Sequence, residues 1–157
     1  MKTTTLYLDT SAIGGYFDDE WKDATQELWR QMEAGRWRFV TSLVTVEELE
    51  HAPERVRELF ERSFSADSLL EPTREIQELA AAYVAQGVVS PKFQDDARHV
   101  AAATVHGVGL LVSWNFKHLV NVRREAGFNG VNLLKGHPAL RIVNPLELIY
   151  EPEDQSV

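Results

Sequence analysis

The sequence contains no cysteine, which excludes disulfide bonds and thiolate-ligated metal sites. It also lacks any apolar run of the roughly 20 residues that a membrane-spanning helix needs. Basic residues are scarce: 16 Lys and Arg against 24 Asp and Glu leave a formal charge of −8, which argues against a nonspecific DNA-binding protein. Met1 and Lys2 lead directly into a short strand-like segment without signal-peptide character, so we expect a cytoplasmic protein.

The composition instead favours one globular domain. The 157 residues are 44% hydrophobic and include four Trp, so we expect a single domain over 1–150 and a frayed tail at 151–157. Strand-like segments alternate with helical segments, which predicts an α/β fold with a mostly parallel sheet covered on both faces. Residues 116–134 look helical at first and irregular around Gly127 and Gly130.

Charge is unevenly distributed along the chain. The segment from Trp114 to Arg141 holds five basic residues and one acid, a formal charge of +4, and leaves −12 for the rest. Such a segment can contact a polyanion locally, although an ordinary mixed surface has the same composition. Its basic residues nearest the strand-like run 110–113 are Lys117, Arg123 and Arg124.

Four acidic or amide residues follow strand-like or short polar segments at widely separated positions. They are Asp9, Glu48, Asp96 and Asn115. The carboxyl ends of parallel strands and the starts of the following helices share one edge of a sheet, where ligands bind. Carboxylates gathered there repel one another unless a cation lies between them, and oxygen ligands favour Mg²⁺ or Mn²⁺. The arrangement predicts a metal-dependent phosphoryl-transfer site.

Each of these acids also has a purely structural interpretation. Asp9 is placed to cap a helix start. Thr45 and Glu48 have the spacing of a capping box, in which each side chain bonds the other's backbone N–H. Asp96, like its neighbour Asp95, is favourable at a helix N-terminus because of the helix dipole.

Several neighbouring residues leave further alternatives open. Glu47, Glu48 and Glu50 compete for the role of functional acid, since they point about 100° apart around a helix. His99 lies one turn after Asp96, where it orients that acid, touches substrate or is simply a buried histidine. Trp114 either stacks on a nucleic-acid base or plugs the end of the sheet, and the same holds for Phe116.

Taken together, the motifs resemble those of the PIN-domain nucleases, and specifically the VapC-like toxins of type II toxin–antitoxin systems. The resemblance covers residues 5 to about 149. Its pieces are Leu8-Asp9-Thr10-Ser11, Ser42-x-x-Thr45-x-x-Glu48-Leu49, Asp96-Ala97-x-x-x-Ala101-Ala102 and Ser113-x-Asn115. The family spacing selects Glu48 over Glu47 and Asp96 over Asp95.

The resemblance implies a three-layer α/β/α fold with a sheet of four or five strands. It implies an endoribonuclease that uses Mg²⁺ or Mn²⁺, forms a homodimer and is blocked by a protein antitoxin. Asp9 and Asp96 would hold the metal, and Glu48 would complete the catalytic set. Many members have Asp where this chain has Asn115, so at most one tightly held ion is expected. The expected substrate contacts are Thr10, Ser11, Ser113, Trp114, Asn115 and Lys117.

Two other functional classes remain compatible with the sequence. A phosphatase of the haloacid dehalogenase type also begins its site with Asp at a strand end, but it needs a second Asp where this chain has Ser11. A PIN-like module that binds RNA or protein without cutting would be marked by loss of the acids, and three are present.

Overall fold

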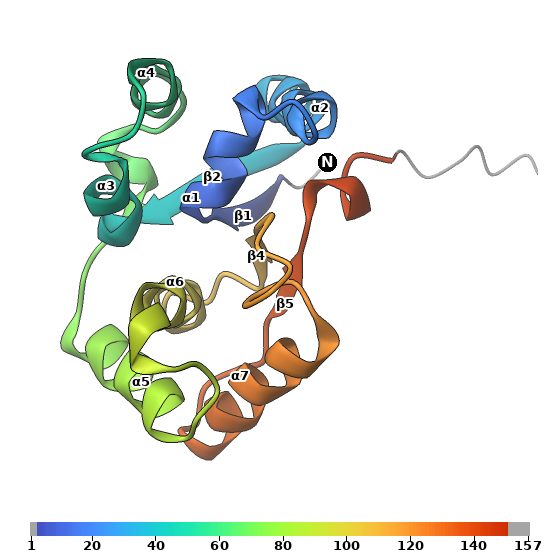
Figure 1. The fold of residues 1–157 in the computed structure, drawn as a ribbon. Helices are drawn as coiled ribbons and strands as arrows, with labels where there is room; N and C mark the ends of the chain where they lie inside the picture. The colour runs from blue at the N-terminus through green and yellow to red at the C-terminus, as the bar shows by residue number, and fades with distance from the viewer. Residues whose placement is uncertain (1–2, 151–157) are drawn as a thin grey trace, which may run out of the picture.

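In the computed structural model, which describes residues 3–150, five parallel strands form one sheet in the order β3-β2-β1-β4-β5. From β1 the chain moves outward to β2 and β3, and then crosses to the other side of β1 for β4 and β5 (Figure 1). The direction of winding thus reverses between β1 and β4, the kind of position where open α/β sheets bind ligands. The strands are β1 (Thr4–Leu8), β2 (Trp37–Ser42), β3 (Leu69–Leu70), β4 (Leu110–Val112) and β5 (Arg141–Val143).

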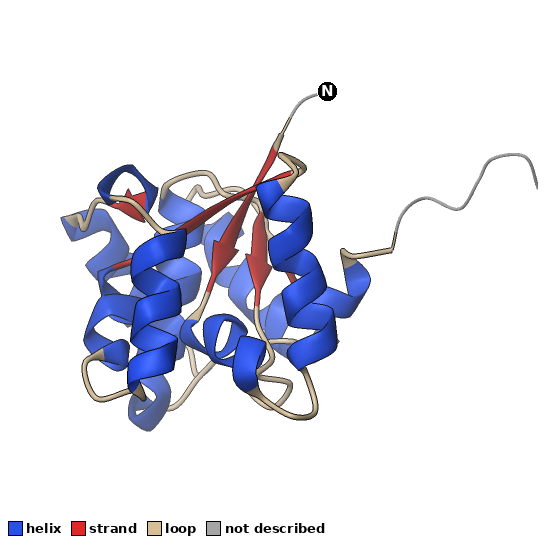
Figure 2. Ribbon diagram, turned by 90° about the horizontal axis from the view of Figure 1, so that it is seen from above, coloured by secondary structure: helices blue, strands red, loops and turns tan. Residues whose placement is uncertain are grey.

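Helices cover both faces of this sheet (Figures 1 and 2). One face packs against α1, α2 and α4, and the opposite face packs against α5, α6 and α7. The three-layer α/β/α, PIN-like fold expected from the sequence is therefore confirmed. The helices are α1 (Thr10–Gly14), α2 (Lys22–Glu33), α3 (Leu43–Leu49), α4 (Glu54–Ser63), α5 (Arg74–Ala85), α6 (Gln94–Val105) and α7 (Val122–Leu134), with short 3₁₀ turns η1 (Gly15–Phe17), η2 (Ala66–Ser68), η3 (Pro91–Phe93) and η4 (Pro145–Glu147).

The central strand β1 is buried on both faces, which explains its continuous apolar run. Leu6 and Leu8 belong to the core cluster under α1, α2 and α4. Tyr7, between them, belongs to the opposite cluster under α5, α6 and α7, as the alternation of side chains along a strand requires. Because β1 is the central strand, its carboxyl end is surrounded by neighbouring strands, and Asp9 is the residue that follows it.

The sequence predicted a helix at the start of residues 116–134 and an irregular segment later, and the structure has the reverse order. The segment begins as an irregular loop, and α7 then runs without a break through Gly127 to Leu134. The helix starts where it does because the Asn121 side chain accepts a hydrogen bond from the Arg124 backbone N–H at 2.8 Å. Gly127 is a packing residue, since a Cβ there would lie 3.1 Å from a methyl group of Val88.

Two further expectations concern the C-terminal tail and membrane-spanning segments. The expected frayed tail at 151–157 lies outside the described residues. Within residues 3–150, no helix has the length and apolar character needed to cross a membrane.

Candidate active site

Asp9 sits at the carboxyl end of β1 and caps α1. Its Oδ1 accepts hydrogen bonds from the Ala12 backbone N–H at 2.9 Å and from the Ser11 hydroxyl at 2.8 Å. The carboxylate is 3% exposed. Burial raises the pKa of Asp9, while the charge of His99 and these hydrogen bonds oppose the increase. The capping role is therefore real, and it fixes the orientation of a buried acid.

Residues from β4 complete the hydrogen bonding of Asp9 across the switch point. The Ser113 hydroxyl donates to Asp9 Oδ2 at 2.6 Å. The Ser11 hydroxyl lies 3.2 Å from that of Ser113 and also accepts from the Trp114 backbone N–H at 2.9 Å. Ser11 and Ser113, expected to contact substrate, are thus committed to holding Asp9 and joining the ends of β1 and β4.

The capping box expected for Thr45 and Glu48 does not form. Helix α3 begins at Leu43, directly after β2, so Thr45 lies inside the helix and not at its start. Its hydroxyl is 2.7 Å from the Thr41 hydroxyl, in the buried space beneath α3. The position of Glu48 is therefore not explained by a capping box with Thr45.

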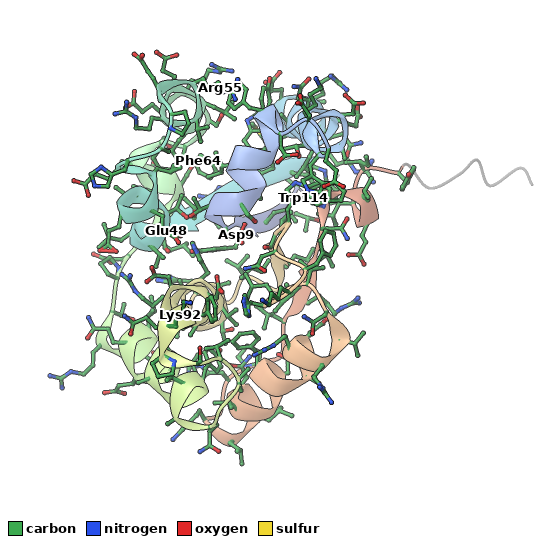
Figure 3. The ribbon with its side chains drawn as sticks, viewed as in Figure 1. Asp9, Glu48, Arg55, Phe64, Lys92 and Trp114 are labelled. Carbon is green, nitrogen blue, oxygen red and sulfur yellow. The ribbon has the colours of Figure 1, made fainter. Side chains whose placement is uncertain are left out.

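The structure separates the three competing glutamates. Glu47 pairs with Arg98 at 2.9 Å, and Glu50 follows the end of α3. Glu48 instead turns toward the end of β1, where its Oε1 accepts from the Thr10 hydroxyl at 2.5 Å. Figure 3 shows Glu48 on α3 and Asp9 at the start of α1, on the same level above α6.

The pKa of Glu48 reflects these contacts. Burial raises it, but a hydrogen bond from His99, the charge of that ring and the Thr10 hydroxyl together lower it below its usual value. Thr10, expected to contact substrate, is therefore a hydrogen-bond partner of Glu48. The side chain is one-third exposed, so it is reachable from solvent.

Asp96 lies in the first turn of α6 and is half-buried. Its side chain makes no hydrogen bond or ion pair within residues 3–150. Burial, followed by the charges of Asp9, Glu48 and Asp95, raises its pKa to about 6, although His99 opposes the shift. The neighbouring Asp95 is instead neutralised by Arg98 at 3.0 Å. Asp96 is thus the acid of this pair that feels an unbalanced negative charge.

His99 is buried, at 2% exposed, and does not line a solvent-facing surface. Its Nε2 lies 2.7 Å from Glu48 Oε1, and its Nδ1 lies 2.7 Å from the Tyr7 hydroxyl. Of the three interpretations left open, a buried histidine is the one that agrees with the structure, and its hydrogen bond goes to Glu48 and not to Asp96. A histidine one turn after Asp96 is visible in the sequence, but its partner Glu48 comes from a distant helix.

The expectation that Trp114 stacks on a base is also wrong. Its ring is 7% exposed and stacks on Trp21, with ring centroids 4.3 Å apart. It fits because the chain has Gly15 beneath it, where a Cβ would come within 2.5 Å of the indole nitrogen. Phe116 is 42% exposed beside this pair and is the aromatic side chain available to a ligand.

Asn115 and Lys117 lie in the loop between β4 and α7. The amide oxygen of Asn115 accepts from the His118 backbone N–H at 3.0 Å, so that oxygen shapes the loop and is not free to hold a phosphate. Lys117 is exposed and its side chain makes no hydrogen bond or ion pair within residues 3–150. Of the two, Lys117 is the one available to a substrate.

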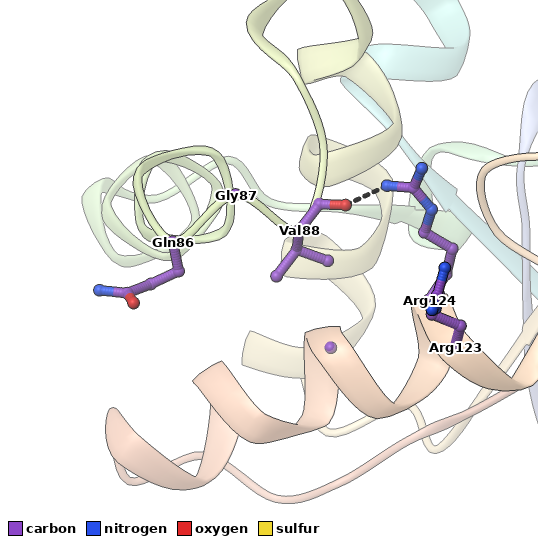
Figure 4. A pocket seen from close by; sticks show the side chains of 6 residues that line it. Gln86, Gly87, Val88, Arg123 and Arg124 are labelled. Carbon is purple, nitrogen blue, oxygen red and sulfur yellow. Dashed lines mark hydrogen bonds between the residues drawn. The ribbon is translucent and has the colours of Figure 1, made fainter.

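A pocket of about 360 Å³ lies between α7 and the loop that follows α5 (Figure 4). Arg123 and Arg124 both line it, but they differ in environment. The Arg124 guanidinium donates to the Val88 carbonyl and so fastens α7 to that loop. Arg123 is exposed. Burial is the largest cause of the lowered pKa of the nearby His118, and the charges of Arg124 and Lys117 lower it further.

The acids at the sheet edge offer oxygen ligands, and the nearby nitrogen of His99 is bonded to Glu48, so the chemistry of the available ligands fits Mg²⁺ or Mn²⁺. The electrostatic coupling among Asp9, Glu48 and Asp96 and the unpaired state of Asp96 fit it as well. Over residues 3–150, however, no three His, Asp or Glu side chains converge closely enough to form a preformed metal cage. An ion would therefore be held by Asp9 and Asp96 with water in the remaining positions.

No family model and no curated protein matches the sequence. Solved structures do match. FitAcB from Neisseria gonorrhoeae has a TM-score of 0.58 and 15% identity, over 91% of this chain and 99% of the other. VapBC2 from Rickettsia felis, bound to a DNA fragment from their promoter, has a TM-score of 0.55 and 14% identity, over 90% of this chain and 98% of the other.

These findings correct the family assignment. The identification of the chain as a VapC-like toxin of the PIN-domain nucleases is wrong as it stands: the matching structures are toxin–antitoxin complexes, and the likeness does not assign this chain to one of their two proteins. Both neighbours are complexes, and a likeness of 14–15% identity shows the fold alone. The motifs misled because each is short and is also what a strand-to-helix turn needs: Asp9 caps one helix, and Asp96 opens another.

Proposed function

We propose that the protein is an endoribonuclease that hydrolyses RNA phosphodiester bonds with Mg²⁺ or Mn²⁺, and that it belongs to a toxin–antitoxin pair. The proposal of metal-dependent catalysis depends mainly on the state of the Asp96 carboxylate. This acid is half-buried, has no hydrogen-bonding partner among the described residues, and has its pKa raised to about 6 by burial and by neighbouring acids. Such an unbalanced carboxylate is the environment that a divalent cation stabilises.

The residues around the edge have separate tasks in this proposal. Asp9 and Asp96 hold the ion, and Ser113 and Ser11 keep Asp9 in orientation. When bound, the ion lowers the pKa of a coordinated water and neutralises charge on the phosphate. Glu48 is ionised, since its pKa is lowered, and can accept the proton of the attacking water.

The toxin–antitoxin role rests on the structural neighbours, which are toxin–antitoxin complexes. By this analogy a protein antitoxin would cover the acidic edge and block access of RNA. A homodimer remains part of the proposal, to be tested by the mass of the purified chain in solution.

A non-catalytic module that binds RNA or protein is the second candidate. The observation that favours it is the absence, within residues 3–150, of a preformed three-ligand metal cage. A phosphatase of the haloacid dehalogenase type is disfavoured, because the position of its second acid is Ser11, whose hydroxyl is bonded to Asp9.

Cleavage assays with matched variants distinguish these possibilities. The purified protein should cut RNA with Mg²⁺ or Mn²⁺ and stop when EDTA is added. Asp9→Asn and Asp96→Asn should each lower the cleavage rate by more than about 100-fold, as expected when a metal-holding group is removed. Asp95→Asn is the control for Asp96→Asn, since Asp95 lies in the same turn but pairs with Arg98.

Circular dichroism and thermal unfolding of each variant show whether the fold is intact. Cleavage by Asp96→Asn at the wild-type rate would show that the catalytic assignment is wrong. RNA binding without cleavage, and without any metal dependence, would favour the non-catalytic module.

A further inference from the structure

A chain of hydrogen bonds leads from the core to one oxygen of Glu48. Oε1 accepts from the Thr10 hydroxyl at 2.5 Å and contacts His99 Nε2 at 2.7 Å. Oε2 makes no hydrogen bond within residues 3–150. The two oxygens of this carboxylate are therefore in different situations: one is held by two partners, and the other is free.

The His99 ring is itself fixed from behind. Its Nδ1 lies 2.7 Å from the Tyr7 hydroxyl, which lies 2.6 Å from the Ser42 hydroxyl. Tyr7 is fully buried, and its ring packs edge-on against the imidazole, with centroids 5.7 Å apart and planes at 72°. With both ring nitrogens bonded and the ring enclosed, the imidazole cannot turn without breaking a buried hydrogen bond.

The direction of the bond to Glu48 follows from the groups involved. An ionised carboxylate only accepts, so His99 Nε2 must carry the hydrogen that it shares with Oε1. In the neutral ring the other nitrogen, Nδ1, then accepts, so the Tyr7 hydroxyl donates to Nδ1 and the Ser42 hydroxyl donates to the Tyr7 oxygen. With these directions every polar group of the chain from Ser42 to Glu48 has a partner.

This hydrogen-bonded chain also joins the elements that carry the proposed site. Tyr7 comes from β1, two residues before Asp9, and His99 comes from α6, three residues after Asp96. Its final acceptor, Glu48, comes from α3. A shift of α3 relative to α6 would break the bond between His99 and Glu48, so the bond sets the position of Glu48 relative to Asp96.

We propose that Tyr7 and His99 are positioning residues for Glu48: they hold Oε1 so that Oε2 is presented to the water of the bound ion. This inference rests on the proposed metal-dependent function. It goes beyond that function by giving the two carboxylate oxygens different roles. A histidine with only a packing role would affect stability, and its effect would not depend on whether position 48 is a glutamate.

Two substitutions one methylene apart provide the test. The amide of Gln lies as far from the backbone as Nε2 of His, so His99→Gln keeps a donor for Glu48. The amide of Asn lies as far as Nδ1, so His99→Asn keeps the contact to Tyr7 and loses the contact to Glu48. We expect His99→Asn to lower kcat about 10- to 100-fold with little change in KM, and His99→Gln to retain most of kcat.

A double-mutant cycle separates positioning from packing. In a Glu48→Gln background, His99→Asn should lower kcat no further, because the group that it positions is already absent. Mn²⁺ affinity, measured by calorimetry on the protein without RNA, should follow the same order. We expect a loss of about tenfold in His99→Asn and none in His99→Gln. Thermal unfolding of every variant gives the structural cost separately.

Tyr7→Phe has a matched control in this chain. Tyr83 is equally buried, and its hydroxyl donates to Asn132 at 2.5 Å in the core between α5 and α7. Tyr7→Phe removes two buried hydrogen bonds, to His99 and to Ser42, and Tyr83→Phe removes one, so both melting temperatures should fall and that of Tyr7→Phe should fall further. Only Tyr7→Phe should lower kcat and Mn²⁺ affinity.

Additive losses in the cycle, or equal kcat values for His99→Asn and His99→Gln, would overturn the positioning role while leaving the nuclease proposal intact. A wild-type protein that binds Mn²⁺ but cuts no RNA would defeat the nuclease proposal alone, and the order of Mn²⁺ affinities would then decide the positioning role. A wild-type protein that binds no Mn²⁺ would overturn both.

Discussion

At the scale of single residues, the site holds an acid in an environment that does not suit its charge. Asp96 has its pKa raised from 3.8 to about 6 because it is partly buried and faces other acids. Its neighbour Asp95 has no such unbalanced charge, because it forms an ion pair with Arg98. A protein that retains such a residue unpaired is less stable than it could be, as is common where a site must bind something.

The sign of the resulting pH dependence can be worked out. Between pH 4 and 6 the folded protein keeps a proton on Asp96 that the unfolded chain has lost, so stability falls as the pH rises through this window. A shift of about two units corresponds to about 3 kcal/mol, which solvent screening at this half-buried position reduces to about 1 kcal/mol. We expect Asp96→Asn to be more stable than wild type by about this amount at pH 7.5 in EDTA.

Thermal unfolding across pH checks this prediction. The difference between variant and wild type should disappear near pH 3.5, where Asp96 is protonated in both states of the wild type. Saturating Mn²⁺ should reverse the order at pH 7.5, because the ion stabilises only the form that binds it. A wild-type protein as stable as the variant at every pH would show that Asp96 is not strained.

Asn115 allows a second prediction at this scale. Its amide oxygen already accepts from the His118 backbone N–H. Asn115→Asp should keep that bond with one oxygen and present a second, charged oxygen to the site. We expect Mn²⁺ affinity to rise by about tenfold or more, and calorimetry of the wild type to show at most one tight ion. Two tight ions in the wild type, or an unchanged affinity in the variant, would contradict the proposed geometry.

At the scale of the elements, the turn after β1 depends on a close contact between one glycine, Gly15, and the indole of Trp114. Gly15 begins the η1 turn at the end of α1, and a Cβ there would meet the Trp114 side chain at 2.5 Å and the Thr25 hydroxyl at 2.9 Å. Gly14, one residue earlier, has open space around it. The two positions therefore form a natural pair for comparison.

We expect Gly15→Ala to cost about 2 kcal/mol of stability through overpacking, and Gly14→Ala to be neutral or slightly stabilising. Since Trp114 follows Ser113, displacement of the indole by Gly15→Ala should also disturb the bond from Ser113 to Asp9. Urea unfolding of both variants measures the cost, and Mn²⁺ affinity measures the effect on the site. Equal stability of the two variants would show that the indole can move without cost.

The elements themselves were largely predictable, because local features decide them. Apolar runs marked the strands, and helix ends coincide with Gly35, Gly87 and Gly107, which have positive φ values in the structure. The start of α7 was not predictable, since it depends on the Asn121 cap and on the loop that Arg124 fastens to Val88. Helical spacing in the sequence does not reveal such contacts.

The site was predictable only in part, for a similar reason. Asp9 stands out because a carboxylate directly follows an apolar strand, whereas Glu48 and Asp96 lie on helices and stand out only by their spacing. The burial of Trp114 against Trp21 was not visible, because those two residues meet only after β1 and β4 pair. The link from Tyr7 through His99 to Glu48 joins three elements and likewise leaves no signal in the local sequence.

At the scale of the whole molecule, the proposed function requires that a protein of charge −8 binds RNA through a local group of basic side chains. Lys117 and Arg123 are exposed at the site end of the +4 segment, whereas Arg124 is bonded to the Val88 carbonyl. Each phosphate contact with a single strand contributes about −0.7 to the slope of log affinity against log salt. We therefore expect Lys117→Ala and Arg123→Ala each to weaken RNA binding and to flatten this slope.

Lys135→Ala serves as the control, because Lys135 lies at the far end of α7. Phe116→Ala should weaken binding without changing the slope, since stacking on a base displaces no counterions. Affinities measured across a salt series separate these effects. If both Lys117→Ala and Arg123→Ala had the wild-type salt slope, RNA would have to bind on another face of the protein.

The strand order also has a consequence for the time at which the site comes into existence during synthesis. Asp9 is made 104 residues before its partner Ser113, which follows the strand on the other side of β1. Contacts between such distant segments form late, after most of the chain is available. A growing chain that ends before β4 has the acid but not the edge that orients it. Under the proposed function, cleavage activity would therefore begin only after β4 and β5 have joined the sheet.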